Sequence, residues 1–175
     1  MQGRLVNLRP IEKADLTALN RWKNNETLYM FLGGGYQPIS PDQQEEWLES
    51  MIDLTGNNRR FIVLADGKAV GMVGLYDINW IHRTCEIGAF IGDKNARRKG
   101  YARDACLTLE QYAKDYLNLR KIKLKVVSDN SKAKTMWTKL GYQEVGQLKE
   151  ERFIKGCYHD LTIMEKFLNI VGEGV

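Results

Sequence analysis

One stretch near the middle of the chain constrains the fold more than any other: a short apolar segment, a basic loop with one glycine, and a helical pattern follow each other directly. The apolar segment, Cys85 to Ile91, is rich in β-branched and aromatic residues and ends at Gly92, which is typical of a strand. Apolar residues at helical spacing follow Gly100 over 102–116. A strand, a loop and a helix in this order present the unpaired backbone N–H groups of the helix start to a ligand.

The loop has the composition of an anion-binding site. Arg97, Arg98, Lys99 and Arg103 carry positive charge, and Gly100 has no Cβ to keep a ligand away from the backbone. The helix dipole adds partial positive charge at the same place. A solvated basic turn that opens a surface helix is an equally ordinary interpretation, because one glycine and a few cations are a weak signal by themselves.

Composition limits the class of protein. With 43% hydrophobic and 27% charged residues, the 175-residue chain is expected to form one globular domain, residues 1–175. No apolar run reaches the ~20 residues of a membrane span, and the first residues lead directly into a strand-like segment, so we expect a cytoplasmic protein with no membrane partner. The three cysteines and two histidines are scattered, which predicts idle thiols and no metal site.

The positive charge is mild and does not predict a nucleic-acid partner. The formal net charge is +4, and the densest basic run, 120–125, alternates cations with apolar residues as a strand with one wet face does. Aromatic residues do not interleave with these charges, although a platform for stacking bases would need them. We therefore expect no nucleic acid among the partners.

Periodicity and turn residues predict the remaining elements. Strands are expected over 4–9, 61–65, 69–78, 122–127, 142–146 and 160–167, and helices over 15–22, 40–56 and 130–140. Ser40 and Gln43 form a capping box at the start of the second helix, Ile52 belongs to its buried stripe, and Gly56 ends it. His82 is expected in an exposed turn, an Asp-Gly pair at 66–67 in a hairpin, and 172–175 in a frayed end. The order of elements predicts a mixed α/β (α+β) sandwich.

Two motifs resemble a known family. Arg97-Arg98-Lys99-Gly100-Tyr101-Ala102 is similar to the (Arg/Gln)-x-x-Gly-x-(Gly/Ala) signature of the GNAT superfamily of acyl-CoA-dependent N-acetyltransferases. The later run from Asn130 to Tyr142 resembles the second block of that superfamily, Asn-x-x-(Ala/Ser)-x-x-x-Tyr-x-Lys-x-Gly-Phe. The segments 4–10, 85–93 and 160–166 resemble the subgroup of ribosomal-protein and spermidine acetyltransferases. The resemblance covers essentially the whole chain. It implies a mixed, mostly antiparallel sheet of about six to seven strands, flanked by about four helices and splayed in the middle for the cofactor.

The resemblance also implies acetyl-CoA as the acetyl donor, without a metal. The pyrophosphate would bind at the helix start, and the pantetheine arm would run beside the preceding strand, where a backbone N–H near Phe90 or Ile91 would polarise the thioester carbonyl. The implied cofactor-binding residues are Phe90, Ile91, Gly92, Arg97, Arg98, Lys99, Gly100, Tyr101, Ala102, Arg103 and Asn130. Asn130 has an equally weighted interpretation as a helix N-cap.

Two residues are candidates for proton transfer. A lysine-like amine has a pKa of about 10 and must lose a proton before it attacks a thioester. Glu86, on the strand that would carry the acetyl end, is the leading candidate for the base, and a structural ion pair is its alternative role. The usual tyrosine of the second block is replaced by Trp137, whose indole N–H is not a practical acid. Tyr142 is the first candidate acid, and Tyr158, Cys157 and solvent remain open alternatives.

The first half of the chain is expected to select the acceptor. Segment 24–36, with its hinge at Gly33–Gly35, falls where family members close over the acceptor. Acidic residues at 26, 42, 45, 46 and 49 would suit a cationic amine, or they simply form a polar helix face. The predicted function is direct acetyl transfer in a ternary complex to a primary amine, either a protein N-terminus such as that of a ribosomal protein, or a small amine such as a polyamine or amino sugar. A catalytically weak acyl-CoA sensor or interaction module is the alternative, and a homodimer is a further expectation.

Overall fold

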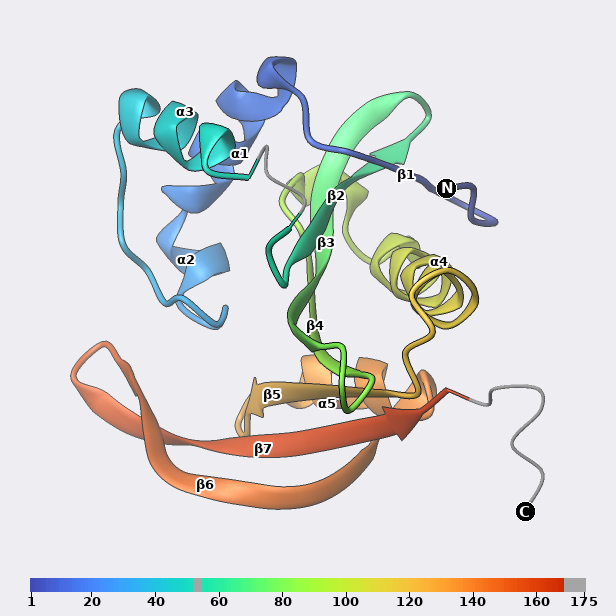
Figure 1. The fold of residues 1–175 in the computed structure, drawn as a ribbon. Helices are drawn as coiled ribbons and strands as arrows, with labels where there is room; N and C mark the ends of the chain where they lie inside the picture. The colour runs from blue at the N-terminus through green and yellow to red at the C-terminus, as the bar shows by residue number, and fades with distance from the viewer. Residues whose placement is uncertain (52–54, 169–175) are drawn as a thin grey trace.

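The computed structural model describes residues 1–51 and 55–168, which form a seven-stranded sheet and five α-helices (Figure 1). The strand order is β1-β2-β3-β4-β5-β7-β6, and only β4 and β5 pair in parallel. The strands are β1 (Asn7–Arg9), β2 (Arg59–Ala65), β3 (Lys68–Asn79), β4 (Thr84–Ile91), β5 (Lys121–Val127), β6 (Gln143–Ile154) and β7 (Cys157–Phe167). The helices are α1 (Leu16–Lys23), α2 (Glu26–Tyr29), α3 (Pro41–Glu49), α4 (Tyr101–Asp115) and α5 (Ser131–Lys139). The mixed, mostly antiparallel sheet is the predicted one.

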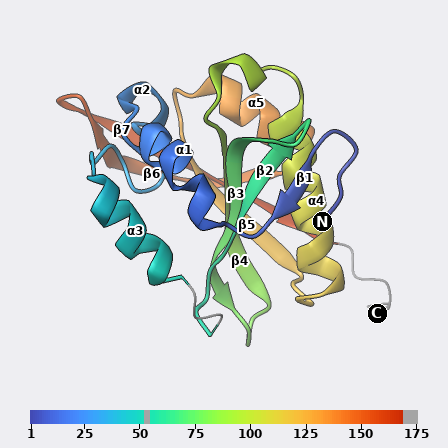
Figure 2. The same cartoon turned by 90° about the horizontal axis from the view of Figure 1, so that it is seen from above.

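The two faces of the sheet carry different helices. Helix α4 covers one face of β1–β4, and α1 and α3 lie across the other (Figure 2). Alternation along β4 serves both layers: Cys85 and Ile87 join the larger core beneath α4, whereas Phe90 packs with Trp22 of α1 in a second cluster. Residues of β4 that share the face of Phe90 therefore point toward the helices of the first half of the chain.

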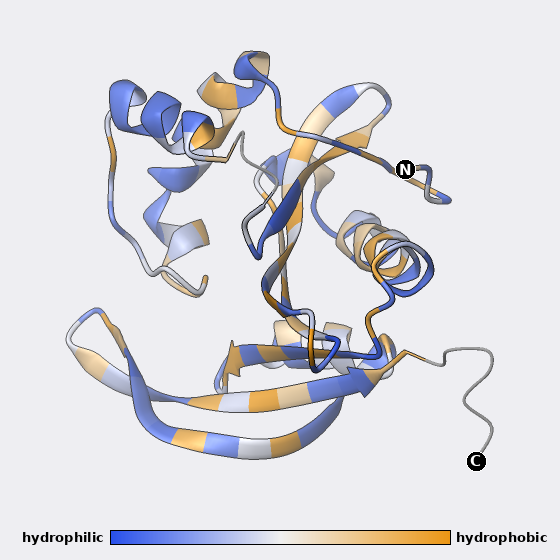
Figure 3. Cartoon of the chain, viewed as in Figure 1, coloured by the Kyte–Doolittle hydropathy of each residue, from blue (hydrophilic) through white to orange (hydrophobic). Residues whose placement is uncertain are grey.

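The first and the next-to-last predicted strands differ from the observed ones. The strand predicted over 4–9 is paired with β2 only from Asn7, because the carboxylate of Asp104 on α4 accepts the N–H groups of Arg4, Leu5 and Val6 at 3.3, 2.7 and 3.0 Å. The strand predicted over 142–146 extends to Ile154, because it forms a long hairpin with β7, in which polar and apolar residues are interspersed (Figure 3).

The short helix α2 was not predicted, and α3 is shorter than expected. The side chain of Asn25 caps α2 by accepting the N–H of Leu28, inside segment 24–36, for which no helix was predicted. The capping box of Ser40 and Gln43 is present at α3, which ends at Glu49. The predictions for Ile52 and for 172–175 lie outside the described residues. His82 is exposed in a turn, as predicted, and the three cysteines are free thiols.

Candidate active site

Strands β4 and β5 separate after three rungs. Their parallel pairing covers Thr84, Cys85 and Glu86 of β4, opposite residues 121–123 of β5. Beyond that point β4 continues to Ile91 paired with β3 alone, and β5 continues to Val127 paired with β7 alone (Figure 1). The predicted splay in the middle of the sheet is therefore present, and no described residue pairs as a strand with the two edges that face each other across it.

The orientation of the backbone selects which groups of β4 face this opening. Gly92 donates its N–H to Val70 O on the β3 side, at 2.9 Å. Because backbone groups alternate along a strand, the N–H and C=O of Ile91 and Ala89 point the other way, toward the opening. The ring of Phe90 is buried on the α1 face. Alternation thus favours Ile91 or Ala89 over Phe90 as a donor to a thioester carbonyl, a role that stays a prediction.

The loop after β4 ends in a row of backbone donors. Arg98 and Gly100 have left-handed backbones, with φ of 64° and 82°, and α4 begins at Tyr101 without a side-chain cap. Among the described residues, no atom accepts a hydrogen bond from the N–H groups of 98–103. Left-handed residues alternating with others turn successive N–H groups into one concave site for an anion. The side chains of Arg98, Lys99 and Arg103 are exposed around it.

Two predicted residues fix the loop to the end of the strand. The guanidinium of Arg97 donates from Nε to Ile91 O at 3.1 Å and from Nη2 to Gly92 O at 3.5 Å. A Cβ on Gly92 would lie 2.3–2.4 Å from the indole carbons of Trp22, so the close approach of α1 requires glycine there. Tyr101 packs on the larger core, and the predicted contact of its neighbour Ala102 with cofactor stays untested.

Glu86 lies at the last paired rung, where the opening begins. Its side chain is 27% exposed and shares a face with Phe90. One carboxylate oxygen lies 3.1 Å from Nζ of Lys125 on β5, an ion pair that the sequence did not reveal. The position suits a base for an amine at the opening, and the ion pair also fits the alternative structural role. The alternation of 121–125 was visible in the sequence, but only the register of β4 and β5 shows which lysine reaches Glu86.

The second motif packs into the core. Asn130 Oδ1 accepts the N–H of Ala133 at 3.2 Å, so the N-cap interpretation is confirmed, and a contact with cofactor stays a prediction. The buried rings of Trp137 and Tyr142 meet edge to face, with centroids 5.2 Å apart. Burial, with the nearby carboxylate of Glu110, raises the pKa of Tyr142 far above its ordinary value. This environment opposes the predicted role of Tyr142 as an acid, and we do not carry that role forward.

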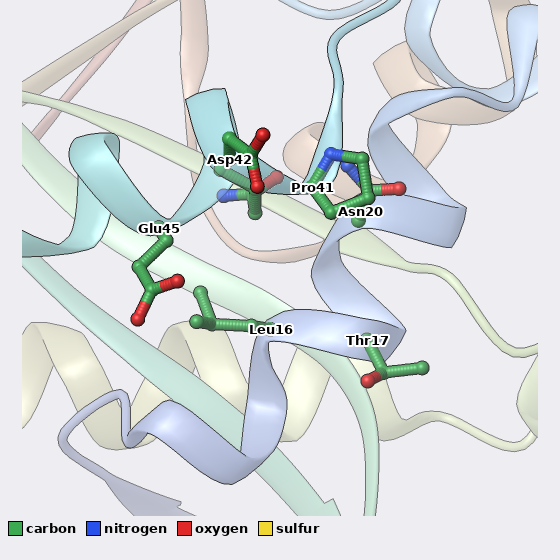
Figure 4. Close-up of a pocket in the computed structure, with 7 residues that line it drawn as sticks. Leu16, Thr17, Asn20, Pro41, Asp42 and Glu45 are labelled. Carbon is green, nitrogen blue, oxygen red and sulfur yellow. The ribbon is translucent and has the colours of Figure 1, made fainter.

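The acidic residues of the first half do not gather at the opening. Glu45 pairs with Lys13, and Glu26 pairs with Lys155 at 3.0 Å. A hollow of about 230 Å³ lies between α1 and α3 (Figure 4), and no residue of β4 or β5 lines it; its lining is Leu16, Thr17, Asn20, Pro41, Asp42, Gln44 and Glu45. These contacts fit the polar-face interpretation, and a role of the acids toward a cationic acceptor stays a prediction.

In the described ranges no cluster of three or more His, Cys, Asp or Glu side chains is placed to hold a metal ion. No helix there is long and apolar enough to cross a bilayer.

Comparison with known proteins places these features in context. The model of the acetyltransferase (GNAT) domain matches residues 5–143. The spermidine N(1)-acetyltransferase of Vibrio cholerae is 32% identical over 94% of this chain and 96% of its own. The putative ribosomal N-acetyltransferase YdaF of Bacillus subtilis is 28% identical over 90% and 88%. The crystal structure of the V. cholerae enzyme with CoA and spermine superposes with a TM-score of 0.86 at 33% identity, covering 93% of this chain and 95% of that one. Another structure of that enzyme, with a TM-score of 0.81, is described as dodecameric.

Proposed function

The chain belongs to the GNAT acetyltransferase family and uses acetyl-CoA, and from this premise we propose that it acetylates a primary amine by direct attack in a ternary complex. The observation that carries the proposal is that two sets of backbone groups without described partners lie next to each other in one loop and strand. The free N–H groups of 98–103 lie at the start of α4, and the open edge of β4 leads from there to Glu86. One loop thus joins a site for a diphosphate to a track that ends at a carboxylate.

The residues present fit acetyl-CoA. The N–H groups of 98–103 would hold the diphosphate, with Arg98, Lys99 and Arg103 adding charge. The outward N–H groups of Ile91 and Ala89 and the C=O of Ala89 would pair with the pantetheine arm as a further strand would, whereas the C=O of Ile91 already accepts from Arg97. Arg97 and Gly92 would act on the shape of the loop, because they hold it against the strand end and α1.

Proton transfer would centre on Glu86. Acetyl-CoA supplies the acetyl group as an activated thioester. Glu86 accepts the proton of the incoming ammonium, directly or through water, and frees the nitrogen lone pair for attack. The N–H of Ile91 or Ala89 donates to the carbonyl oxygen as negative charge develops there. The leaving thiolate, with a thiol pKa near 8.5, can take its proton from solvent, which removes the need for a tyrosine at position 137.

The acceptor class, the location and the assembly are the finer parts of the proposal. One relative is named a spermidine acetyltransferase and another a putative ribosomal acetyltransferase. The proposal therefore includes both a small amine and a protein N-terminus as acceptors. We also propose that the protein is cytoplasmic and that it assembles into a homodimer.

A panel of amines and peptides, assayed by mass spectrometry for acetyl transfer and by thiol release, tests the proposal. Acetylation of at least one class, above hydrolysis of acetyl-CoA, is expected. Thiol release at the rate of hydrolysis with every acceptor would contradict it and favour the acyl-CoA sensor.

Paired variants test the base. Glu86→Gln should lower kcat, because the amide cannot accept the proton of the ammonium. The remaining rate should rise with pH only as free amine becomes available in solution. Glu165→Gln is the matched control, since Glu165 lies on the same face of the sheet in a comparable pair with Lys121, at 2.9 Å. An unchanged profile in Glu86→Gln would remove Glu86 from the mechanism.

A further inference from the structure

On the face of the sheet around Glu86, two neighbouring positions on β3 and β4 are glycines. The register aligns Arg60 of β2 with Gly74 of β3 and Gly88 of β4. Two residues further along, on the same face, Tyr76 pairs with Glu86. The ring of Tyr76 folds over the two glycines: a Cβ on Gly74 would lie 2.8 Å from its hydroxyl, and one on Gly88 would lie 3.2 Å from Cε2. Tyr76 therefore lies across two strands, with Glu86 directly beside it.

Arg60 lies on the other side of the same ring. Its guanidinium carbon is 5.0 Å from the ring centroid of Tyr76 and 5.7 Å from that of Trp47. Its Nη1 donates to Met51 Sδ at 3.0 Å, and in the described part of the chain no carboxylate lies within ion-pair distance of it. The planar fork of an arginine matches a carboxylate or phosphate, so this guanidinium can take an anionic partner while it stays stacked on the rings.

A second cation on this face also lacks a counter-ion. Nζ of Lys23 lies 4.5 Å from the ring centroid of Tyr29, and no carboxylate among the described residues pairs with it. Burial lowers the pKa of this lysine, as it does for an ammonium without an anion. Tyr29 packs edge-on against Phe90, so Lys23 lies over the strand that carries Glu86. Glu86 itself is already paired with Lys125.

The charges on this face do not suit a polyamine. A chain of ammonium groups laid across Tyr76 would approach Arg60 and Lys23, and like charges a few ångströms apart in a partly desolvated site repel by more than 1 kcal/mol, roughly, for each pair. An anionic group there would give Arg60 the counter-ion that no described carboxylate supplies, in addition to its contacts with Met51 and Tyr76. Arg60 and Glu86 flank one ring, so a single small molecule can reach both.

We propose that the acceptor is a small primary amine that also carries a carboxylate or a phosphate, with its amine at Glu86, its body across Tyr76 and its anionic group on Arg60. Lys23 adds positive charge on the same side. This inference rests on the proposed acetyl transfer, and it assigns Arg60 as the residue that sets the acceptor class.

Matched pairs of acceptors test the proposal. Glucosamine 6-phosphate is compared with glucosamine, and an ω-amino acid with its amide, and spermidine serves as the cationic comparison. The anionic member of at least one pair is expected to have a kcat/KM at least tenfold higher than its neutral partner, and the better pair distinguishes phosphate from carboxylate. Equal values within both pairs, or the highest value for spermidine, would overturn the inference while leaving acetyl transfer intact.

Variants and a binding measurement make the test specific. Arg60→Gln should reduce the preference for the anionic member at least tenfold, and Arg60→Lys should restore part of it. Arg59→Gln is the matched control, because it removes the same charge from the adjacent residue on the opposite face of β2. Calorimetric titration of each pair into the protein–CoA complex reports the subsite without turnover. An unchanged preference in Arg60→Gln, by kinetics and by binding, would remove Arg60 as the anion site.

Discussion

Two substitutions at Gly100 separate charge from shape at the proposed diphosphate site. Gly100 precedes α4 with φ of 82°, a left-handed conformation that Asn and Asp tolerate better than other side chains do. Either side chain starts from a Cβ 3.3 Å from Leu5 Cδ1, so both meet the same neighbour. Gly100→Asn and Gly100→Asp should each cost about 1 kcal/mol of stability, and they differ by one negative charge.

The charge sets the expected difference in affinity. A carboxylate on residue 100 would lie about 6 Å from a diphosphate held by the N–H groups of 98–103, where two unit charges repel by about 3 kcal/mol at an effective dielectric constant near 20. Gly100 is exposed, so water and salt reduce this repulsion to about 1–2 kcal/mol. Gly100→Asp should therefore bind acetyl-CoA roughly tenfold more weakly than Gly100→Asn.

Isothermal titration of acetyl-CoA at low and high salt measures this difference, which should narrow as salt rises. The same pair of substitutions at Gly156 is the control, because Gly156 also has a left-handed backbone, φ of 84°, but lies in the β6–β7 turn with no atom within 4 Å of its Cβ position. Equal affinities for the two Gly100 variants, or an equal loss at Gly156, would show that the diphosphate binds elsewhere.

Two further predictions concern the framework. Asp104→Ala leaves the N–H groups of Leu5 and Val6 without their acceptor. It should lower the free energy of unfolding, measured by urea titration, by about 2–3 kcal/mol. A loss below about 0.5 kcal/mol would show that Asp104 does not hold the N-terminal segment in place. Burial opposes ionisation of Asp15, but hydrogen bonds from Arg9 and the N–H of Glu12 outweigh it and lower its pKa, so its stabilisation is present above the unfolded pKa of about 3.9 and lost as the pH falls through the folded one. The deficit of Asp15→Asn in urea should therefore be largest at neutral pH and shrink in acid, and a constant deficit would refute the linkage.

Local signals predicted the elements that local chemistry determines. The expected helix over 102–116 is α4 within one residue at each end, because Gly100 marks its start and the apolar spacing its length. The Asp-Gly pair at 66–67 forms the predicted β2–β3 turn, since both residues have the positive φ that this turn requires. Ser40 and Gln43 cap α3 through contacts three residues apart. Each of these features is complete within a few residues of chain.

Elements that depend on distant partners were predicted less well. The polar segment after Gly146 has no apolar alternation to indicate a strand, and it extends to Ile154 because β7 pairs with it. The strand expected from residue 4 begins at Asn7 because Asp104, far along the chain, captures the preceding N–H groups. In both cases a backbone hydrogen bond to a remote group overrides the local pattern.

The candidate site also has one half that local sequence determines and one half that depends on distant partners. Its donor half consists of backbone groups at one strand end and one helix start, so a contiguous motif locates it in any chain that carries the motif. Its acceptor half consists of side chains from β2, β3 and β4, and only their register brings Arg60, Tyr76 and Glu86 onto one surface. Relatives can therefore share the first half and differ in the second, because a single substitution on β2 changes the charge that an acceptor meets. Family membership specifies the donor, and in our proposal the rung of Arg60, Gly74 and Gly88 specifies the acceptor.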